Sequence, residues 1–506
     1  MRGLIAIPAK RSRLLQAVLG SILAVAVLLI PGTVEAARDK ALEERLREHI
    51  RILASDEFGG RQPGTEGEAM TLRYLGRLWF DLGLQSGTND PGNPWFAPVT
   101  LVAREPADSR AQFVVNGRQV PISPSEVLLL TSGKRSLLRN APMLFVGRAD
   151  RLEYARSELA GRVAVVLDAD EGGSERQDAL LRQVASAVIT VLDGARSLSQ
   201  VAARRQRTGY ALANDVLGGD LEGFLTATAM ARMLEGTGHT LASLDAESRR
   251  ANFSPIALRI SASLEATTSE TTIRTYNLIG RLPGRNPATG EVLLVAHWDH
   301  FGECAEAPAE DIVCNGAVDN ASGVAVLTEV ARRLSKGPKM DRDVYFLATT
   351  AEELGLLGAH AFADSPPVPL TDIVAAFNID TIAIAPRGTP VAIVGEGMTG
   401  LDADIANVVK RARRKLVSGR EANEYVRRQD GWAFLQHDVP AVMVSSAYGE
   451  IERIQRFFET HYHRPDDDPG PDLELGGAAE DVALHVALVR WFADAKVYLP
   501  DSQTTP

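Results

Sequence analysis

The stretch from Val292 to Gly323 constrains the fold more than any other part of the chain, because it joins a strand pattern to a helix pattern. Val292–Ala296 is a short, continuous apolar run, which is typical of a strand buried on both faces of a parallel sheet. Beyond the loop that follows, apolar residues recur at helical spacing over residues 324–334. This order of elements predicts a strand of an open α/β sheet, followed by a helix.

Histidine and aspartate side chains occupy both junctions of this stretch. His297 ends the predicted strand and Asp299 follows two positions later, so the two side chains are expected to point the same way. Asp319 stands at the start of the predicted helix, and ligands of open α/β sheets collect at the carboxyl ends of strands. Alone, this window fits either a metal site or a buried histidine with a hydrogen-bonded aspartate.

Strand and helix patterns alternate through the rest of the C-terminal half. We expect strands at residues 291–297, 343–349, 373–379, 390–395 and 440–445, and helices at 320–335, 355–363, 400–416 and 476–493. Alternation of this kind predicts an α/β sheet with helices on both faces.

Four further side chains of metal-ligand type follow the later strands. Glu352 and Glu353 come after one predicted strand, Asp380 after the next, and His463 beyond residues 440–445. Two histidines and three carboxylates form a donor set that zinc accepts, and one shared carboxylate can bridge two zinc ions about 3.5–4 Å apart. Adjacent glutamates can face different targets, so one is expected to be a ligand and the other a base. A metal site is now the favoured interpretation.

Five motifs connect these residues with a known family. They are HWDH at His297–His300, NGAVDNASG at Asn315–Gly323, AEELGLLGA at Ala351–Ala359, NID at Asn378–Asp380 and YHRPDDD at Tyr462–Asp468. In order and spacing, the chain resembles the exported di-zinc aminopeptidases, co-catalytic zinc peptidases of the clan that also contains glutamate carboxypeptidase and glutaminyl cyclase. The segment FGGRQPGTEGE and the helix after it are similar to the N-terminal part of that family's domain.

The resemblance implies an α/β zinc-peptidase domain with a mixed, mostly parallel sheet flanked by helices, acting on peptide substrates. It also implies a role for each matching residue: His297 and Asp380 on one zinc ion, Glu353 and His463 on the other, Asp319 bridging both, Asp299 orienting His297, and Glu352 as general base. Two zinc ions would lower the pKa of a shared water towards about 7, within reach of a carboxylate base.

Two positions depart from the family pattern. Val318 stands where relatives often have a second aspartate, and Gly431 replaces the histidine of a Ser-Asp-His motif of which Asp430 is kept. Tyr448 or Tyr462 could supply a donor to the oxyanion.

Two other classes of function stay open. One is a related di-zinc carboxypeptidase, dipeptidase or cyclase, for which Arg427, Arg428 and Arg464 could bind a carboxylate. The other is a non-catalytic binding protein of the same fold. The six residues expected to hold metal or act as base are all present, which favours an enzyme.

The domain organisation expected from the chain has five parts. They are a signal peptide at residues 1–36, an N-terminal part of the peptidase domain at 37–130, a smaller β-rich insert at 131–265, the main peptidase domain at 266–497 and a tail at 498–506. The insert is similar in position to the family's protease-associated domain and carries no cluster of candidate ligands. A Thr-rich linker is expected at Thr267–Thr275.

The N-terminus resembles an export signal. Basic residues precede an apolar run from Leu14 to Ile30, and Val34-Glu35-Ala36 offers small residues for cleavage. We therefore expect an exported protein, periplasmic or secreted, with no stable membrane partner. An uncleaved membrane anchor is the alternative. The net charge of -11 argues against a nucleic-acid partner.

The only two cysteines, Cys304 and Cys314, lie in the loop between His297 and Asp319. In an exported protein a disulfide is the expected state. Free thiols and zinc ligation are the alternatives.

Overall fold

The structure is a computed structural model of the chain, and it describes residues 31–148, 154, 156–168, 179–182, 184–215, 220–305, 308–417, 419–471 and 473–500. The apolar run at 14–30 and the last six residues lie outside these ranges, so the export signal stays a prediction. Its expected cleavage point falls within helix α2 (Pro31–Leu53). Within the described ranges, every helix is too short or too polar to span a bilayer.

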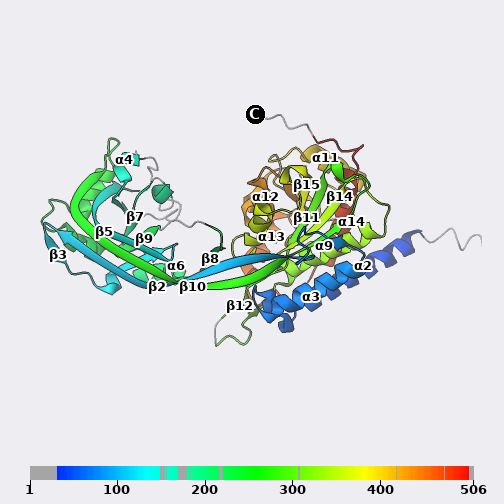
Figure 1. Cartoon of the computed structure of the whole chain (residues 1–506), viewed down its shortest axis with the longest axis horizontal. Helices are drawn as coiled ribbons and strands as arrows, with labels where there is room; N and C mark the ends of the chain where they lie inside the picture. Colours follow the sequence, from blue (N-terminus) through cyan, green and yellow to red (C-terminus); the bar gives the residue numbers. More distant parts are fainter. Residues whose placement is uncertain are drawn as a thin grey trace, which may run out of the picture. The chain divides into compact units, whose positions relative to one another are not determined.

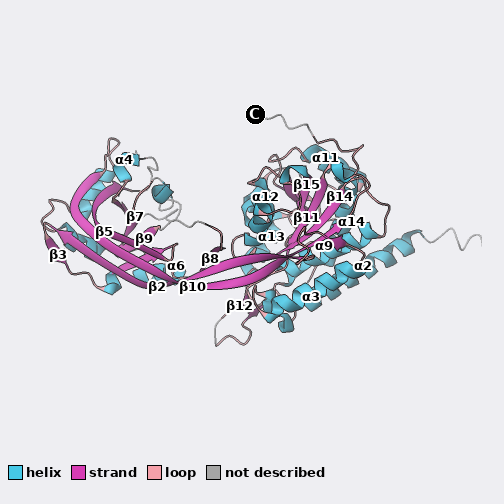
Figure 2. Cartoon of the chain, viewed as in Figure 1, coloured by secondary structure: helices cyan, strands magenta, loops and turns pink. Residues whose placement is uncertain are grey.

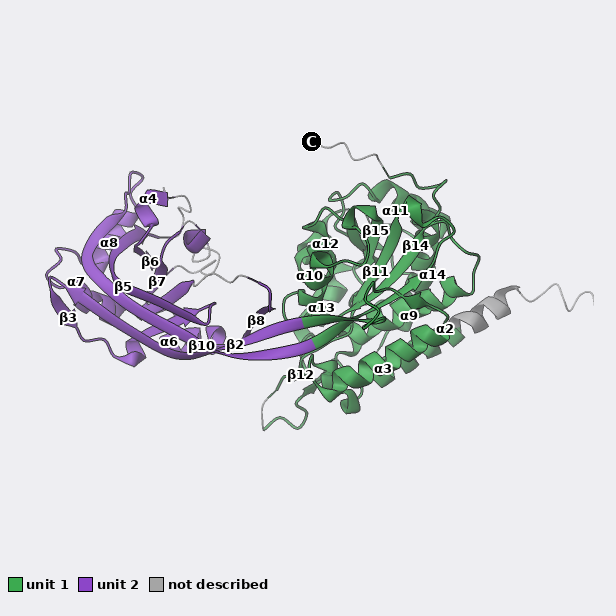
Figure 3. Cartoon of the chain, in the orientation of Figure 1, with its two compact units in different colours: residues 1–99, 275–506 green, residues 100–274 purple. Residues whose placement is uncertain are grey.

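The chain folds into two compact units, coloured separately in Figure 3. Unit 1 comprises residues 1–99 and 275–506, and unit 2 comprises residues 100–274. All the candidate site residues belong to unit 1.

A mixed, mostly parallel sheet forms the centre of unit 1, which confirms the predicted fold class. Its four central strands run parallel in the order β17-β15-β11-β14, with β16 antiparallel beside β17 and β10 antiparallel beside β14. A short strand, β1, pairs with β10. The bounds are Gln85–Ser86 (β1), Ile256–Leu282 (β10), Glu291–His297 (β11), Asp343–Thr349 (β14), Ile373–Asn378 (β15), Ala392–Val394 (β16) and Ala441–Ser445 (β17).

Helices cover both faces of this sheet, as Figures 1 and 2 show. Leu294 and Phe346 point into a core shared with α2, α3, α9, α11 and α14, whereas Leu293 and Leu347 point into a second core shared with α10 and α12. Every residue of β11 and β14 is buried, which explains their continuous apolar runs. The helix bounds are Glu66–Asp81 (α3), Gly323–Ser335 (α9), Leu357–Asp364 (α10), Asp402–Arg411 (α11), Gly431–Leu435 (α12), Ile451–Thr460 (α13) and Leu475–Phe492 (α14).

Unit 2 is built on a second group of strands. Parallel strands β5, β6, β7 and β9 are flanked by antiparallel β10 and β4, and β2 pairs with β3 and β8. The bounds are Phe96–Val115 (β2), Arg118–Val120 (β3), Val127–Thr131 (β4), Arg135–Gly147 (β5), Val163–Leu167 (β6), Ala187–Leu192 (β7), Gly209–Leu212 (β8) and Leu221–Thr226 (β9), with helices Arg156–Leu159 (α4), Leu198–Arg205 (α6), Ala227–Leu234 (α7) and Leu241–Ser248 (α8).

The boundary of unit 2 differs from that of the expected insert. The insert was expected to begin at residue 131, but unit 2 begins at Thr100, because β2 continues through residues 100–115 and pairs with β3 and β8. The expected linker Thr267–Thr275 is wrong: these residues belong to β10. β-branched threonines favour a strand, and up to Ala266 the side chains of β10 alternate between buried and more exposed.

Two helix starts have clear local causes. Helix α3 begins at Glu66, where the Thr65 hydroxyl donates to the Gln62 carbonyl and the Glu68 carboxylate accepts from the Gly64 amide. Helix α7 begins at Ala227, because the preceding residues form β9.

Candidate metal centre

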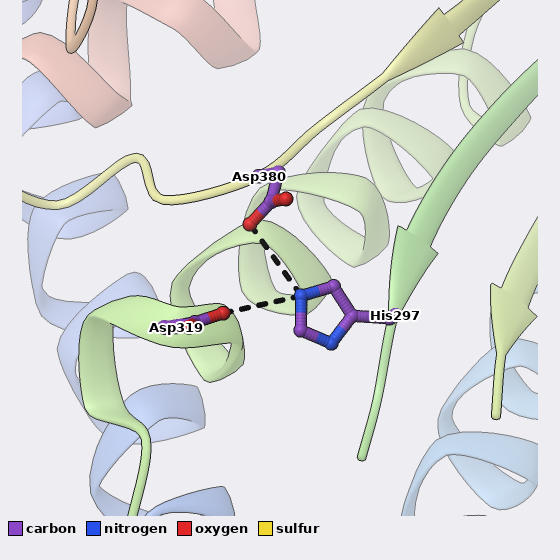
Figure 4. A group of neighbouring side chains, drawn as sticks. All are labelled: His297, Asp319 and Asp380. Carbon is purple, nitrogen blue, oxygen red and sulfur yellow. Dashed lines mark ion pairs between the residues drawn. The ribbon is translucent and has the colours of Figure 1, made fainter. Parts of the chain in front are cut away.

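His297 is the last residue of β11, and its imidazole faces two aspartates (Figure 4). Its Nε2 atom lies 3.2 Å from Oδ1 of Asp319 and 3.5 Å from Oδ1 of Asp380. Asp380 comes just after β15, the strand beside β11, and Thr381 donates a hydrogen bond to it. The three side chains offer ligand atoms that all lie within 4.8 Å of one another. The expected His297–Asp319–Asp380 group therefore comes together.

Asp319 lies between two histidines. It belongs to an irregular helical turn, Ala317–Ser322, that leads into α9, and it is 3% exposed. While Oδ1 faces His297, Oδ2 lies 3.5 Å from Nε2 of His463. Asp467 accepts hydrogen bonds from the backbone amides of Val318 and Asp319, which fixes the turn. This is the position that a bridging carboxylate needs.

The two adjacent glutamates follow β14 and face different histidines. Oε2 of Glu353 lies 3.0 Å from Nε2 of His463, whereas Oε2 of Glu352 lies 3.9 Å from Nε2 of His297. Both side chains are buried. The fold therefore allows one glutamate to be a metal ligand and the other to be a base, as expected.

Asp299 does not orient His297 through its carboxylate as expected. Nδ1 of His297 lies 3.2 Å from the backbone carbonyl oxygen of Asp299 and 3.8 Å from its carboxylate. The strand ends at His297, so the alternation assumed for residues 297 and 299 does not continue. The Asp299 carboxylate instead accepts a hydrogen bond from the backbone amide of Glu352, at 3.1 Å. It holds the turn that carries the predicted base.

His463 reaches the candidate ligands, whereas His461, two positions earlier, does not. His461 is exposed, contacts the Thr460 hydroxyl and stacks on Phe457, whereas His463 reaches Asp319 and Glu353. Two of the aspartates that follow His463 in the sequence bind elsewhere. Asp467 holds the backbone of residues 318–319, and Asp468 accepts from the side-chain amide of Asn315.

The sequence analysis missed His300. Its side chain is 1% exposed, and its Nδ1 atom lies 2.5 Å from Oε1 of Glu353. With Asp319 and Glu353 it forms a second group whose ligand atoms lie within 4.8 Å of one another. The only signal was the second histidine of HWDH, which by spacing alone could point anywhere beyond the strand.

Burial and crowding of carboxylates govern the electrostatics of this centre. Burial would lower the pKa of His297, but Glu352, Asp380 and Asp319 raise that pKa well above its usual value. Burial also raises the pKa of Glu352 well above its usual value, and the neighbouring Glu353 and Asp380 carboxylates add to the shift. The fold therefore concentrates negative charge in a place with little water, which bound cations would offset.

A small cavity opens onto the carboxylates. Ten residues line it: Asp319, Glu352, Asp380, Thr381, Tyr425, Arg428, Gln429, Tyr448, Phe458 and Tyr462. Burial raises the pKa of both Tyr448 and Tyr462 above the usual value, so both phenols stay protonated and can donate. Both tyrosines named from the sequence thus reach the site.

The departure at Gly431 has a local explanation. Gly431 begins α12, and its amide donates to the side chain of Gln429. Gln429 lines the cavity, whereas Gly431 does not. Asp430 is buried and accepts a hydrogen bond from Thr349 at the end of β14. Three arginines were considered as partners of a substrate carboxylate, and Arg428 is the one that lines the cavity. Arg427 stacks on Trp432, and Arg464 donates to the Thr460 carbonyl.

The loop between His297 and Asp319 is tied as expected. Cys304 and Cys314 form a disulfide, with their Cα atoms 5.7 Å apart. They flank a two-stranded hairpin made by β12 (Gly302–Glu303) and β13 (Val313–Cys314). The cysteines are therefore unavailable as metal ligands.

Comparison with known proteins agrees with this geometry. Residues 277–487 match the model of peptidase family M28. A segment of 101 residues is 36% identical to aminopeptidase YwaD of Bacillus subtilis (strain 168), covering 20% of this chain and 19% of that protein. Another of 76 residues is 34% identical to the alkaline phosphatase isozyme conversion protein of Escherichia coli (strain K12), covering 14% of this chain and 22% of that protein. The alignments thus span about a fifth of each relative.

A solved structure shares the fold. The aminopeptidase from Aneurinibacillus sp. strain AM-1 superimposes with a TM-score of 0.52 at 19% identity, over 89% of this chain and 93% of that chain. The family match includes every candidate ligand from His297 to His463. The part of the chain that carries the candidate ligands, residues 277–487, is therefore similar to peptidase family M28.

Proposed function

We propose that this chain is an exported zinc aminopeptidase that removes N-terminal residues from peptides with two metal ions. The observation that carries the proposal is the position of Asp319, whose two carboxylate oxygens face His297 and His463 at 3.2 and 3.5 Å. Asp380 completes the first group and Glu353 the second. A single carboxylate between two nitrogen-and-oxygen sets is the arrangement that holds a pair of zinc ions.

The donor set fits zinc in its chemistry as well as its geometry. In the described part of the chain, Nε2 of His463 and Oε1 of Glu353 are buried without completing a hydrogen bond, although ion-pair partners lie nearby. Buried polar atoms normally have a hydrogen-bond partner, so such atoms call for another one. A cation bound by both atoms would satisfy them.

Glu352 is the proposed general base. The backbone amide of Glu352 donates to the Asp299 carboxylate. The Glu352 carboxylate lies 3.9 Å from Nε2 of His297, one of the candidate ligands of the first group. Burial raises the pKa of Glu352, which brings a carboxylate closer to the basicity that proton transfer at neutral pH requires. When bound, the zinc ions would lower the pKa of the attacking water and polarise the substrate carbonyl. Glu352 then accepts the proton from that water and donates it to the departing amine.

The cavity supplies further groups that hydrolysis of a peptide bond requires. The protonated phenols of Tyr448 and Tyr462 can donate to the oxygen that becomes negatively charged during attack. Asp319, Glu352 and Asp380 line the same cavity, and acidic oxygens favour a free, positively charged substrate α-amine. These features support selection of N-termini.

Arg428 favours a second candidate, a di-zinc dipeptidase or carboxypeptidase. It lines the cavity with its guanidinium 5.8 Å from the ring centre of Phe458, so it could bind a substrate C-terminal carboxylate. A non-catalytic role has less support, because all five candidate ligands and Glu352 converge.

The test compares four peptides of one sequence: unmodified, N-acetylated, C-amidated, and both N-acetylated and C-amidated. We expect the purified zinc-loaded chain to hydrolyse the unmodified and C-amidated peptides at similar rates and to leave the N-acetylated ones intact. Loss of cleavage on C-amidation would instead favour the dipeptidase or carboxypeptidase. No cleavage of any peptide by a chain that binds zinc would favour the binding protein.

Export is the part of this proposal that rests on sequence alone. Basic residues, an apolar run over 14–30 and a small-residue site at 34–36 support it. The N-terminal sequence of the protein recovered from its native cell tests it, with Ala37 expected as the first residue.

A further inference from the structure

Arg61 is among the largest fully buried side chains of the described chain, at 1% exposure. It belongs to FGGRQPGTEGE, whose function the metal centre leaves unexplained. Its guanidinium donates to four backbone carbonyl oxygens: Nε to Trp298 at 2.7 Å, Nη1 to Leu53 at 2.9 Å and Asn315 at 2.5 Å, and Nη2 to Gly316 at 3.0 Å.

Three of these carbonyls belong to the segments that carry the candidate ligands. Trp298 directly follows His297, and Asn315 and Gly316 lead into the turn that holds Asp319. One side chain therefore joins the end of β11 to the loop before α9, although it comes from a segment 237 positions away from Trp298. The relative position of these two segments sets the distance between His297 and Asp319.

The backbone around Arg61 adopts a conformation that L-residues rarely take. Gly59, Gly60 and Arg61 have φ angles of 51°, 66° and 62°. For a residue other than glycine, this left-handed region costs about 1–2 kcal/mol. Such a conformation persists only where the surrounding contacts fix it, and it is often associated with functional sites.

The segment is also packed tightly against the disulfide-linked hairpin. A Cβ atom on Gly60 would lie 2.4 Å from the carbonyl oxygen of Cys314 and 2.5 Å from the amide nitrogen of Gly302. The hairpin therefore supports the backbone of residue 60, and the next residue projects its guanidinium towards the ligand-bearing segments.

Arg61 also places a positive charge near the acidic centre. Burial lowers the pKa of Arg61 to about 10, while Asp299, Asp467, Asp319 and Glu353 act in the opposite direction. The guanidinium therefore remains charged at neutral pH. All four hydrogen bonds it makes within the described ranges go to carbonyl oxygens, so it leaves the ligand carboxylates available to metal.

We propose that Arg61 is a positioning residue of the metal centre, which holds His297 and Asp319 at ligand distance by fixing the backbone at residues 298 and 315–316. Its effect is on metal affinity as well as on stability. The inference rests on the proposed zinc site, and it assigns to FGGRQPGTEGE a role in building that site.

Arg342 provides a matched control. It is 2% exposed in the same unit and also donates to carbonyls, from Nε to Thr289 at 2.8 Å, from Nη1 to Phe492 at 2.6 Å and from Nη2 to Tyr498 at 3.0 Å. It directly precedes β14, at the opposite end of the strand from Glu352. Loss of Arg342 should destabilise the fold without moving a candidate ligand.

The test measures metal binding by full-length Arg61→Lys and Arg342→Lys. Lysine keeps the charge and loses the fork of donors. Competition with a chelator gives the zinc dissociation constants, and the absorption spectrum of the Co²⁺-loaded protein reports ligand geometry. We expect Arg61→Lys to weaken binding of at least one zinc ion about tenfold or more and to alter the Co²⁺ spectrum. Arg342→Lys should stay within about twofold of wild type with an unchanged spectrum.

Equal zinc affinity and equal spectra in the two variants would overturn the role of Arg61. If Arg61→Lys does not fold, hydrogen exchange of the wild type decides. Removing metal should then increase exchange in peptides covering residues 50–62 and 298–323 but not in those covering 489–498. Unchanged exchange over 50–62 would overturn the proposal.

The two proposals fail differently in these experiments. Wild-type protein that binds zinc but cleaves no peptide contradicts the proposed peptidase, and the Arg61 comparison still stands. Wild-type protein that binds no zinc contradicts the proposed function and the inference with it. Wild-type protein that binds two zinc ions, together with an Arg61→Lys variant of unchanged zinc affinity and Co²⁺ spectrum, contradicts only the positioning role.

Discussion

At the scale of single residues, the centre depends on backbone turns that aim neighbouring side chains in different directions. Ala351, just before the glutamate pair, has a φ of 53°; Thr381, just after Asp380, has 55°; and His463 itself has 57°. Just after the turn at Ala351, Glu352 faces His297 of the first group and Glu353 faces His463 of the second. Strained conformations of this kind cluster at sites where function fixes the geometry.

The glutamate pair yields the first prediction. Glu352→Gln should reduce turnover by about 10²–10⁴-fold, the range for loss of general acid–base catalysis, while both zinc ions stay bound. Glu353→Ala should lose one zinc ion, because it removes a ligand. Metal analysis together with kinetics of the two variants checks this. Zinc loss from Glu352→Gln with two ions retained by Glu353→Ala would mean that the two roles are reversed.

The histidines yield the second prediction. His463→Ala should lose one zinc ion and most activity, because Nε2 lies near Asp319 and Glu353. His461→Ala, which changes an exposed ring two positions away, is the matched control and should keep two. Metal counts on both variants and on His300→Ala decide the ligand. If His300→Ala loses the ion and His463→Ala keeps two, then His300 holds the second metal.

At the scale of secondary structure, the sequence predicted elements whose identity is set by local burial. Strands β11 and β14 match their expected bounds, because every residue in them is buried and the continuous apolar runs mark their extent. Candidate ligands at the ends of these strands were therefore visible as polar residues after apolar runs. The approach of His297 to Asp380 follows from the parallel pairing of β11 with β15, whereas Asp319 comes from the turn before α9.

Features that depend on distant contacts could not be predicted in this way. Of the four carbonyls that accept hydrogen bonds from Arg61, three belong to residues more than 200 positions away from it in the sequence. Helix α13, which separates β17 from His463, was not expected. Residues 267–275 belong to β10, a strand that pairs with β2 and β5. The Asp299 carboxylate accepts from the Glu352 amide and makes no hydrogen bond to His297, because the strand ends at His297.

Glu291 yields a prediction about the opposite end of β11. Burial, with Asp372 and Asp343 nearby, raises the pKa of Glu291 from 4.5 to about 7, and the residue is 7% exposed. The folded state therefore binds a proton more tightly than the unfolded state between these two values. Through this group the free energy of unfolding is highest below pH 4.5, and it falls as pH rises towards about 7.

Glu291→Gln should remove this loss. We expect the variant to resemble wild type near pH 5 and to gain on the order of 1 kcal/mol in unfolding free energy at pH 8. Urea unfolding at the two pH values measures the change, with Glu459→Gln, on an exposed face of α13, as the control. A gain that is the same at both pH values would contradict the linkage to Glu291.

At the scale of the whole molecule, the candidate chemistry belongs to one of the two units. The candidate ligands, the base and the cavity all lie in unit 1, whereas unit 2 has a core of its own around β5, β6 and β7. The similarity of the expected insert to a protease-associated domain stays a prediction. Hydrolysis of a small substrate should therefore be independent of the surface of unit 2.

Charge reversal on unit 2 tests that independence. Arg110→Glu and Arg118→Glu together change exposed side chains of β2 and β3. We expect kcat/KM for a small chromogenic amino-acid amide to stay within about twofold of wild type. A large loss of activity in a protein with wild-type thermal stability would show that unit 2 takes part in the site.

The most direct test of the central claim is the location of bound metal. Anomalous scattering at the zinc edge, from crystals of the zinc-loaded chain, should show two peaks about 3.5–4 Å apart. One is expected between His297 and Asp380 and the other between His463 and Glu353, with Asp319 touching both. A single peak, or two peaks that do not share Asp319, would contradict the di-zinc centre.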